Sequence, residues 1–276
     1  MLAWTASLVV IATMPTREIA PGVHMPIISI GTWKSESGID AYDIVTKWLK
    51  NSETGIDTAL IYGDQGRVAA AIADSGLKRS DIFLTSKIPG CQGAALTKAA
   101  VDADLRYLNT TFIDLMLMHS PYGIGCTSTW KALESLVSDG KLRAIGISNF
   151  EEKNINSLCA DGGCSIMPAV NQIDYSVMHH DDATIAFCKS KNITVEAYSP
   201  LGGTHGTKSV FSNPTVMGIA AKHNVSAAQV ALRWIVQRGD VLTVLSESSA
   251  HQQNDADLWS FELEETEMVA LGKLSA

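Results

Sequence analysis

Four ionisable side chains of different kinds lie at the ends of three consecutive apolar segments of this 276-residue chain. Asp57 falls inside the apolar run 56–60 and Tyr62 just past it, whereas Lys87 and His119 lie near the ends of the runs 82–88 and 112–119. A carboxylate, a phenol, an ammonium and an imidazole are the groups that hold and move protons in catalysis. If the three segments are neighbouring strands, these groups meet in one pocket.

The four residue types also suit one another chemically. A buried ammonium such as that of Lys87 is costly without a partner, and Asp57 is the natural one. A free tyrosine hydroxyl has a pKa of ~10, and a neighbouring ammonium lowers that pKa by stabilising the phenolate. We therefore expect Tyr62 to act as a general acid. His119 can donate a hydrogen bond to a carbonyl oxygen and stabilise the charge that develops there when a hydride arrives.

Each residue taken alone has a structural explanation. Lys87 and Asp57 could be a structural ion pair, His119 a core histidine, and Tyr62 an aromatic at a strand end. For isolated residues these explanations are the better ones. The ordered appearance of all four on consecutive segments favours the catalytic interpretation.

Short β-prone runs alternate with amphipathic stretches along most of the chain. The predicted strands are residues 27–31, 56–60, 82–88, 112–119, 143–149, 169–175, 194–199 and 242–246, and the predicted helices include 39–49, 67–75, 95–105, 128–138, 183–190, 227–237 and 264–274. Eight strand–helix units with right-handed crossovers predict an α/β fold, a (β/α)8 TIM barrel whose active face lies at the carboxyl ends of its strands. An open doubly wound sheet is the alternative, but no G-x-G-x-x-G segment follows an early strand. Pro21 and Gly22 predict a turn and so an N-terminal β-hairpin.

The composition fits one compact unit. The chain is 46% hydrophobic and 18% charged, which allows a large core, and barrels of this length are commonly one domain, so we expect residues 1–276 to form a single domain. The net charge of −8 argues against nonspecific binding to nucleic acid or to anionic membranes. Nothing in the sequence suggests an obligate interface, so we expect a monomer or a weak dimer.

The N-terminal residues and the cysteines bear on location. Residues 2–14 are apolar, but no Lys or Arg precedes them and they are too short to cross a bilayer. We therefore favour the cytoplasm and leave the role of the extension 1–13 open. The chain has five scattered cysteines, with no C-x-x-C pair that would bind zinc or carry out redox chemistry. We interpret them as reduced, mostly buried thiols, and we expect no metal site; they are Cys91, Cys126, Cys159, Cys164 and Cys188.

Several segments, in order along most of the chain, resemble the aldo-keto reductase family. They are GTWK (31–34), GIDTALIYGDQ (55–65), LTSKI (84–88), DLMLMHSP (114–121), GKLRAIGISNF (140–150), NQIDY (171–175) and AYSPLG (197–202). One such segment would be weak, but the combination is specific. The resemblance implies NAD(P)H-dependent reduction of aldehydes or ketones to alcohols, with Asp57, Tyr62, Lys87 and His119 as the catalytic tetrad.

The resemblance also implies contacts with the cofactor and substrate. Ser148, Asn149 and Gln172 match the residues that hold the nicotinamide carboxamide, and Tyr198 matches the aromatic that stacks on its ring. Trp33 matches an aromatic wall of the substrate pocket, which His119 shares. The remaining expected cofactor residues are Gly31, Thr32, Ser199 and Leu201, the last two in the pyrophosphate loop, and Ser246 and Glu247. Alone, these residues would be assigned to turns or to the core.

The sequence departs from the family in the segment after the last predicted strand. The family has lysine and later arginine there for the 2′-phosphate of NADPH, whereas this chain has Glu247 at the lysine position and Gln252 or Gln253 near the arginine position. A carboxylate repels a 2′-phosphate and accepts well from a ribose 2′-hydroxyl, so NADH is the alternative cofactor. The family favours NADPH, which we expect, with Ser246, Ser248, Ser249 and His251 as neutral phosphate ligands.

A second departure is Asp64-Gln65 after the tyrosine, where the family often has asparagine and glutamate. Two other functions are weighed against reduction. A barrel retained only for binding or structure is disfavoured by the complete tetrad. A phosphate-binding lyase or isomerase barrel requires a Gly-rich phosphate loop, for which Gly202-Gly203 is the only hint.

Overall fold

The computed structural model describes residues 15–33, 40–203 and 207–275. The expected extension 1–13, Lys34 of the GTWK segment and the start of the helix predicted from residue 39 lie outside these ranges.

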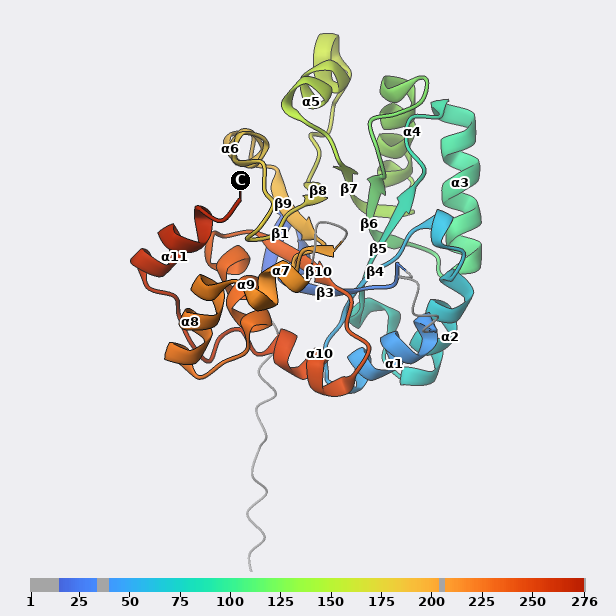
Figure 1. The fold of residues 1–276 in the computed structure, drawn as a ribbon. Helices are drawn as coiled ribbons and strands as arrows, with labels where there is room; N and C mark the ends of the chain where they lie inside the picture. Colours follow the sequence, from blue (N-terminus) through green and yellow to red (C-terminus); the bar gives the residue numbers. More distant parts are fainter. Residues whose placement is uncertain (1–14, 34–39, 204–206, 276) are drawn as a thin grey trace, which may run out of the picture.

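Parallel strands form the centre of the molecule (Figure 1). In the described part of the chain, they make a closed barrel in the order β10-β3-β4-β5-β6-β7-β8-β9. Their bounds are β3 Ile28–Gly31, β4 Gly55–Asp57, β5 Phe83–Ile88, β6 Ile113–Met118, β7 Leu142–Ser148, β8 Val170–Asp174, β9 Thr194–Tyr198 and β10 Val241–Val244. Each of the eight predicted runs overlaps one of them, so the predicted (β/α)8 barrel is confirmed.

Helices surround this barrel (Figure 1). They are α1 Ala41–Lys50, α2 Gln65–Ser75, α3 Gly93–Tyr107, α4 Cys126–Ser138, α5 Glu152–Cys159, α6 Asp182–Ser190, α7 Thr207–Ser212, α8 Pro214–His223, α9 Ala227–Gln237, α10 Ser249–Ala256 and α11 Glu265–Gly272, with short 3₁₀ turns η1 Leu60–Tyr62, η2 Arg79–Asp81 and η3 Ala160–Gly162. Local signals start several of them. Asn213 caps α8 before Pro214, and Ser226 forms a capping box with Gln229 in α9.

The predicted hairpin is present and covers the amino end of the barrel. Strands β1 (Thr16–Ala20) and β2 (Val23–Pro26) pair antiparallel across a turn in which Gly22 has a φ of +71°. The buried side chains of Val23 and Met25 pack against a cluster that includes Phe83 and Val241, the first residues of β5 and β10. The hairpin therefore seals one end of the barrel, and the carboxyl ends of the strands form the other.

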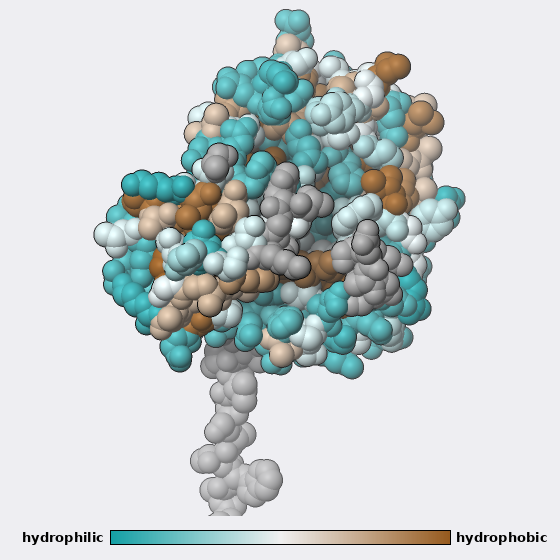
Figure 2. Space-filling model, in the orientation of Figure 1, coloured by the Kyte–Doolittle hydropathy of each residue, from teal (hydrophilic) through white to brown (hydrophobic). Residues whose placement is uncertain are grey.

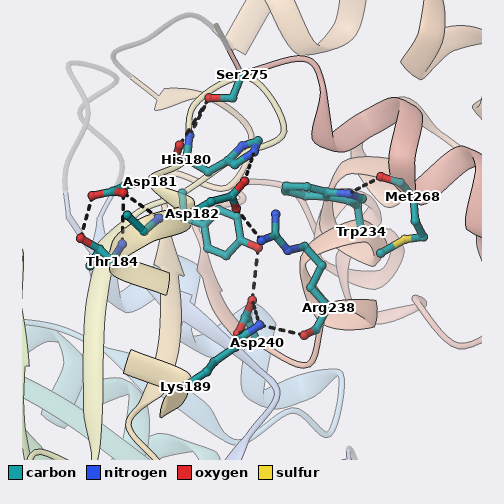
Figure 3. A network of polar contacts seen from close by, with 12 residues as sticks. His180, Asp181, Asp182, Thr184, Lys189, Trp234, Arg238, Asp240, Met268 and Ser275 are labelled. Carbon is teal, nitrogen blue, oxygen red and sulfur yellow. Dashed lines mark hydrogen bonds and ion pairs between the residues drawn. The ribbon is translucent and has the colours of Figure 1, made fainter. Parts of the chain in front are cut away.

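A polar network ties the outer helices to the barrel (Figure 3). Asp240, just before β10, pairs with Lys189 of α6 at 2.9 Å and accepts a hydrogen bond of 3.2 Å from Tyr175, just after β8. Ser275 accepts a hydrogen bond from the backbone N–H of His180 at 3.1 Å. The network fixes helix α6 and the chain beyond α11 on the barrel wall.

Candidate active site

The structure brings Asp57, Tyr62 and Lys87 into direct contact. Asp57 is the last residue of β4, Tyr62 ends the 3₁₀ turn η1, and Lys87 lies near the end of β5. The Lys87 ammonium lies 2.5 Å from an Asp57 carboxylate oxygen and donates to the Thr58 carbonyl at 3.0 Å and to the Tyr62 hydroxyl at 3.3 Å. Lys87 is fully buried. A fixed positive charge therefore lies next to a phenol at the barrel mouth.

The pKa values of the Lys87 ammonium and the Tyr62 phenol depend on burial as well as on the contact between the two groups. Burial alone would lower the pKa of Lys87, but its interactions with Asp57 and Tyr62 raise it above its ordinary value, so Lys87 stays charged. Burial raises the pKa of Tyr62 more than the Lys87 ammonium lowers it. The expectation of a lowered tyrosine pKa is wrong for this structure. At neutral pH the phenol is protonated and can act as a proton donor.

His119 lies beside Tyr62 as an uncharged imidazole. The two ring centroids are 5.8 Å apart, in an edge-to-face arrangement. Burial and then the Lys87 ammonium lower the pKa of His119 to about 4. Its Nδ1 is buried and has no hydrogen-bond partner in the described part of the chain. A neutral imidazole donates from one nitrogen and accepts at the other, so His119 can donate to a substrate oxygen.

Buried hydrogen bonds hold the loop that carries Tyr62. The Thr58 hydroxyl donates to Asp64 at 2.9 Å, and the Gln65 amide donates to Asp104 of α3 at 3.1 Å. Ser86 also donates to Asp104, and burial raises the pKa of Asp104 to about 6. The departure at Gln65 thus has a physical reason, since an amide can donate to the Asp104 carboxyl where a glutamate would repel it. Sequence reasoning missed Asp104, whose only signal is an acid on the buried face of a helix.

Gln172 joins the predicted cofactor residues to the tetrad. Its amide nitrogen donates to Asp57 at 2.9 Å and to Glu196 of β9 at 2.8 Å. Both acceptors are carboxyl groups, so the nitrogen of the Gln172 amide must face them and its oxygen must face away. Sequence reasoning missed Glu196. Its signal is a carboxyl group in the middle of the otherwise apolar run Thr194–Tyr198.

The other residues expected at the nicotinamide lie on the same rim. Tyr198 donates to the Asn149 side chain at 2.9 Å, and the Asn149 amide donates to Ser148 and to the His119 carbonyl, each at 3.1 Å. Asn149 has a φ of +62°, the left-handed turn that ends β7. Trp33 is 58% exposed, with its ring centroid 4.7 Å from that of Tyr62. The structure therefore brings the predicted substrate wall to the tetrad.

The remaining expected cofactor residues follow neighbouring strand ends. Gly31 and Thr32 are buried at the end of β3, and a Cβ on Gly31 would come within 3.1 Å of the Thr243 hydroxyl. Ser199 has a φ of +51° just after β9, and Leu201 is partly buried near it. These positions follow β3 and β9, the strands on either side of β10.

The segment expected at the adenosine end follows β10. Ser246 is buried and donates to Asp255, while Glu247 is exposed and its backbone carbonyl accepts from Lys47 at 2.8 Å. Gln252, one of the two candidates for the arginine position, is buried, and its amide donates to the Ile44 and Ser246 carbonyls. Because these bonds hold the Gln252 side chain inside the protein, the exposed Gln253 is the better match for the arginine position of the family.

The interpretation of all five cysteines as reduced thiols is wrong, because four of them form disulfides. Cys91 is bonded to Cys126 and Cys159 to Cys164, whereas Cys188 is a buried free thiol. The sequence did not reveal the first bond because its cysteines are 35 residues apart and meet only when the loop after β5 packs against the start of α4. Cys91 also bonds through its backbone to Tyr122 and Ile124. The first disulfide thus fixes the segment that follows His119.

Removing the first disulfide should impair substrate binding as well as stability. The Cys91→Ser/Cys126→Ser variant loosens the segment after His119, so we expect a severalfold higher KM and a loss of about 2–5 kcal/mol in the free energy of unfolding. Cys159→Ser/Cys164→Ser is the matched control, because this pair closes a turn outside the tetrad. The check is steady-state kinetics with urea unfolding. Equal KM values for both variants would remove the proposed link to the pocket.

Neither a metal site nor a membrane-spanning helix is found in the described ranges. Among these residues, no group of three or more His, Cys, Asp or Glu side chains could hold a metal ion. No helix within them is both long and apolar enough to span a bilayer.

The fold and the site together define a class of protein: a (β/α)8 barrel with a tyrosine hydroxyl, a buried Lys–Asp pair and a neutral histidine at the carboxyl ends of its strands. The comparison with known families makes the assignment specific. The chain belongs to the aldo/keto reductase family, whose model matches residues 27–276. This family reduces carbonyl compounds with NAD(P)H, and the protein is an oxidoreductase of this kind.

Individual relatives match over nearly the whole chain. The chain is 37% identical to a glyoxal reductase of Bacillus subtilis, over 94% of this chain and 92% of the relative. It is 33% identical to a glycerol 2-dehydrogenase (NADP(+)) of Saccharomyces cerevisiae, over 90% and 87%. The crystal structure of an aldo/keto reductase from Brucella melitensis superimposes with a TM-score of 0.88 at 35% identity, over 95% of this chain and all of that one.

Proposed function

We propose that this protein reduces aldehydes or ketones to alcohols as an NADPH-dependent carbonyl reductase of the alcohol dehydrogenase (NADP+) type, with Tyr62 as the proton donor. The observation that carries the proposal is the buried Lys87 ammonium held between the Asp57 carboxylate and the Tyr62 hydroxyl. A nicotinamide bound at this site supplies a hydride to the carbonyl carbon. The experiment is loss of reduced-nicotinamide absorbance with a simple aromatic aldehyde, and no loss would contradict the proposal.

The side chains of the site have separate roles in proton transfer and substrate orientation. Tyr62 gives its proton to the carbonyl oxygen, and the Lys87 ammonium stabilises the phenolate that remains. Asp57 keeps Lys87 charged and in place. His119 donates a hydrogen bond to the same oxygen and orients it. Trp33, beside Tyr62, forms an aromatic wall for the substrate.

The polar side chains on the rim suit a nicotinamide. With the Gln172 nitrogen held by two carboxyl groups, its oxygen is the group left to accept from a carboxamide. Ser148 and Asn149 supply further polar atoms beside it, and Tyr198 supplies a ring for stacking. The proposed contacts for the rest of the cofactor are Gly31, Thr32, Ser199, Leu201, Ser246 and Glu247.

NADPH is the proposed cofactor, although the Glu247 carboxylate would repel its 2′-phosphate. The name of the yeast relative includes NADP(+), which supports NADPH, whereas an exposed carboxylate weakens binding of a 2′-phosphate.

We predict that Glu247→Lys raises the affinity for NADPH relative to NADH by roughly three- to tenfold, because an exposed charge pair contributes up to ~1 kcal/mol and a repulsion is removed as well. Tryptophan quenching by each cofactor measures the ratio. Glu265→Lys on α11 is the control, and an unchanged ratio in Glu247→Lys would assign specificity to other residues.

The proposal also covers the substrate class, the oligomeric state and the cellular location. We propose a small-molecule carbonyl substrate and one domain that is a monomer or weak dimer. On the face shown in Figure 2, hydrophobic residues are scattered among hydrophilic ones. We propose the cytoplasm as the location, although disulfides are rare there. Thiol counting in native extracts decides: five reduced cysteines support the cytoplasm, and one supports an oxidising compartment.

A further inference from the structure

The proposed reaction leaves one buried carboxyl group unexplained. Glu196 lies in the middle of β9 with 0% exposure. Its Oε1 has no hydrogen-bond partner among the residues that the structure describes. A buried, incompletely paired carboxyl group is costly when ionised. Such a group at the centre of a barrel calls for a reason beyond packing.

Glu196 is connected to the tetrad by hydrogen bonds. Its Oε2 accepts from the Gln172 amide at 2.8 Å, and the same nitrogen donates to Asp57 at 2.9 Å. Asp57 in turn lies 2.5 Å from the Lys87 ammonium, which donates to Tyr62. A change at Glu196 therefore reaches the proton donor through groups that are all in contact.

Two carboxyl groups compete for one ammonium here. The charged groups that face Glu196 are Asp57 from β4 and Lys87 from β5. Neighbouring β10 and the next strand, β3, carry no titratable residue, and Asp114 of β6 pairs with Arg143 of β7. Lys87 contacts Asp57 directly, so Asp57 takes the negative charge. Burial, followed by the charge of Asp57, raises the pKa of Glu196 to about 8.

We propose that Glu196 is a positioning residue that works in its uncharged form, orienting Gln172 for the cofactor, and that its ionisation slows carbonyl reduction. The inference rests on the proposed function, because it assigns Gln172 and Tyr62 their roles. Ionised Glu196 adds a second negative charge beside Asp57. This charge disfavours the phenolate that Tyr62 must become when it gives up its proton. Reduction is therefore fastest below the Glu196 pKa and falls above it.

The test compares the pH dependence of kcat for the parent protein, Glu196→Gln and Glu196→Ala. We expect the parent rate to fall with an apparent pKa of about 8, the value for Glu196. Glutamine cannot ionise but still accepts from Gln172, so Glu196→Gln should keep kcat at neutral pH within about threefold and move the alkaline fall upward by at least ~1 pH unit. Alanine leaves Gln172 without its partner and should lower kcat roughly tenfold, the equivalent of ~1.4 kcal/mol.

Two results would overturn the proposal. One is a Glu196→Gln profile that falls at the same pH as the parent, which would assign the fall to another group such as Tyr62. The other is loss of activity in Glu196→Gln at every pH, which would show that the negative charge is needed.

A second readout does not depend on turnover. Infrared difference spectra between about pH 7 and about pH 9.5 should show the loss of a protonated carboxyl band in the parent that is missing in Glu196→Gln, whereas Glu53, whose pKa burial raises to about 7, contributes equally to both. Absence of that band overturns the uncharged state even if the protein reduces carbonyls. If the band is present but the parent reduces no carbonyl, the proposed function fails instead, and the two failures are distinguished.

Discussion

Replacing Tyr62 by phenylalanine lowers kcat for carbonyl reduction by about 10²- to 10⁴-fold, the range that a positioned general acid contributes. The ring stays, so its contact with Trp33 and the shape of the pocket are kept, and only the proton is removed. The Lys87 ammonium then has no hydroxyl to receive its 3.3 Å hydrogen bond. Cofactor affinity should change by less than about twofold, since a factor of that size corresponds to ~0.4 kcal/mol.

Steady-state kinetics and tryptophan quenching measure the two quantities. Tyr107→Phe, an exposed tyrosine at the end of α3, is the matched control and should keep the parent rate. A large fall in cofactor affinity in Tyr62→Phe, with little change in kcat, would instead indicate that the hydroxyl serves binding.

The second large effect concerns the buried ion pair. Lys87→Met leaves the Asp57 carboxylate uncompensated in the barrel, which should cost about 3–5 kcal/mol in the free energy of unfolding and remove most activity. The double variant Asp57→Asn/Lys87→Met has no buried charge at this pair, so it should recover most of the stability. Activity should not return, because the phenolate of Tyr62 still lacks its ammonium.

Urea unfolding and kinetics on the same three proteins separate the two roles. Recovery of stability without activity identifies the pair as part of the chemistry. If the double variant is as unstable as Lys87→Met, the destabilisation arises from lost packing of the lysine side chain rather than from the stranded charge. A double variant with restored activity would place the proton donor elsewhere.

Much of the fold could be predicted because it depends on local pattern. Hydrophobic periodicity marked each barrel strand, and Pro21-Gly22 marked the hairpin turn. The strand predicted at 56–60 was too long. β4 ends at Asp57, and the 3₁₀ turn Leu60–Tyr62 follows it and presents the tyrosine. Helix α10, with the sequence SAHQQNDA, has no apolar repeat and was not predicted.

The site was predictable where residue type and strand position suffice, as for the tetrad. The rest depends on distances that no local pattern contains. Glu196 bonds to Gln172 of the neighbouring strand β8, Asp104 of α3 to Gln65 of α2, and Cys91 of the loop after β5 to Cys126 at the start of α4. The direction of the Tyr62 pKa shift depends on burial competing with a charge at a known separation. A sequence names both influences but does not show which one is larger.

A single-turnover reaction of the parent protein, with NADPH and a simple aromatic aldehyde, tests the central claim most directly when Tyr62→Phe is run beside it. The measured quantities are the NADPH consumed and the alcohol formed. We predict equal amounts of both in the parent and a rate in Tyr62→Phe that is lower by at least about 10²-fold. No alcohol from the parent, or alcohol from Tyr62→Phe at the parent rate, would contradict a phenol that protonates the carbonyl oxygen in this barrel.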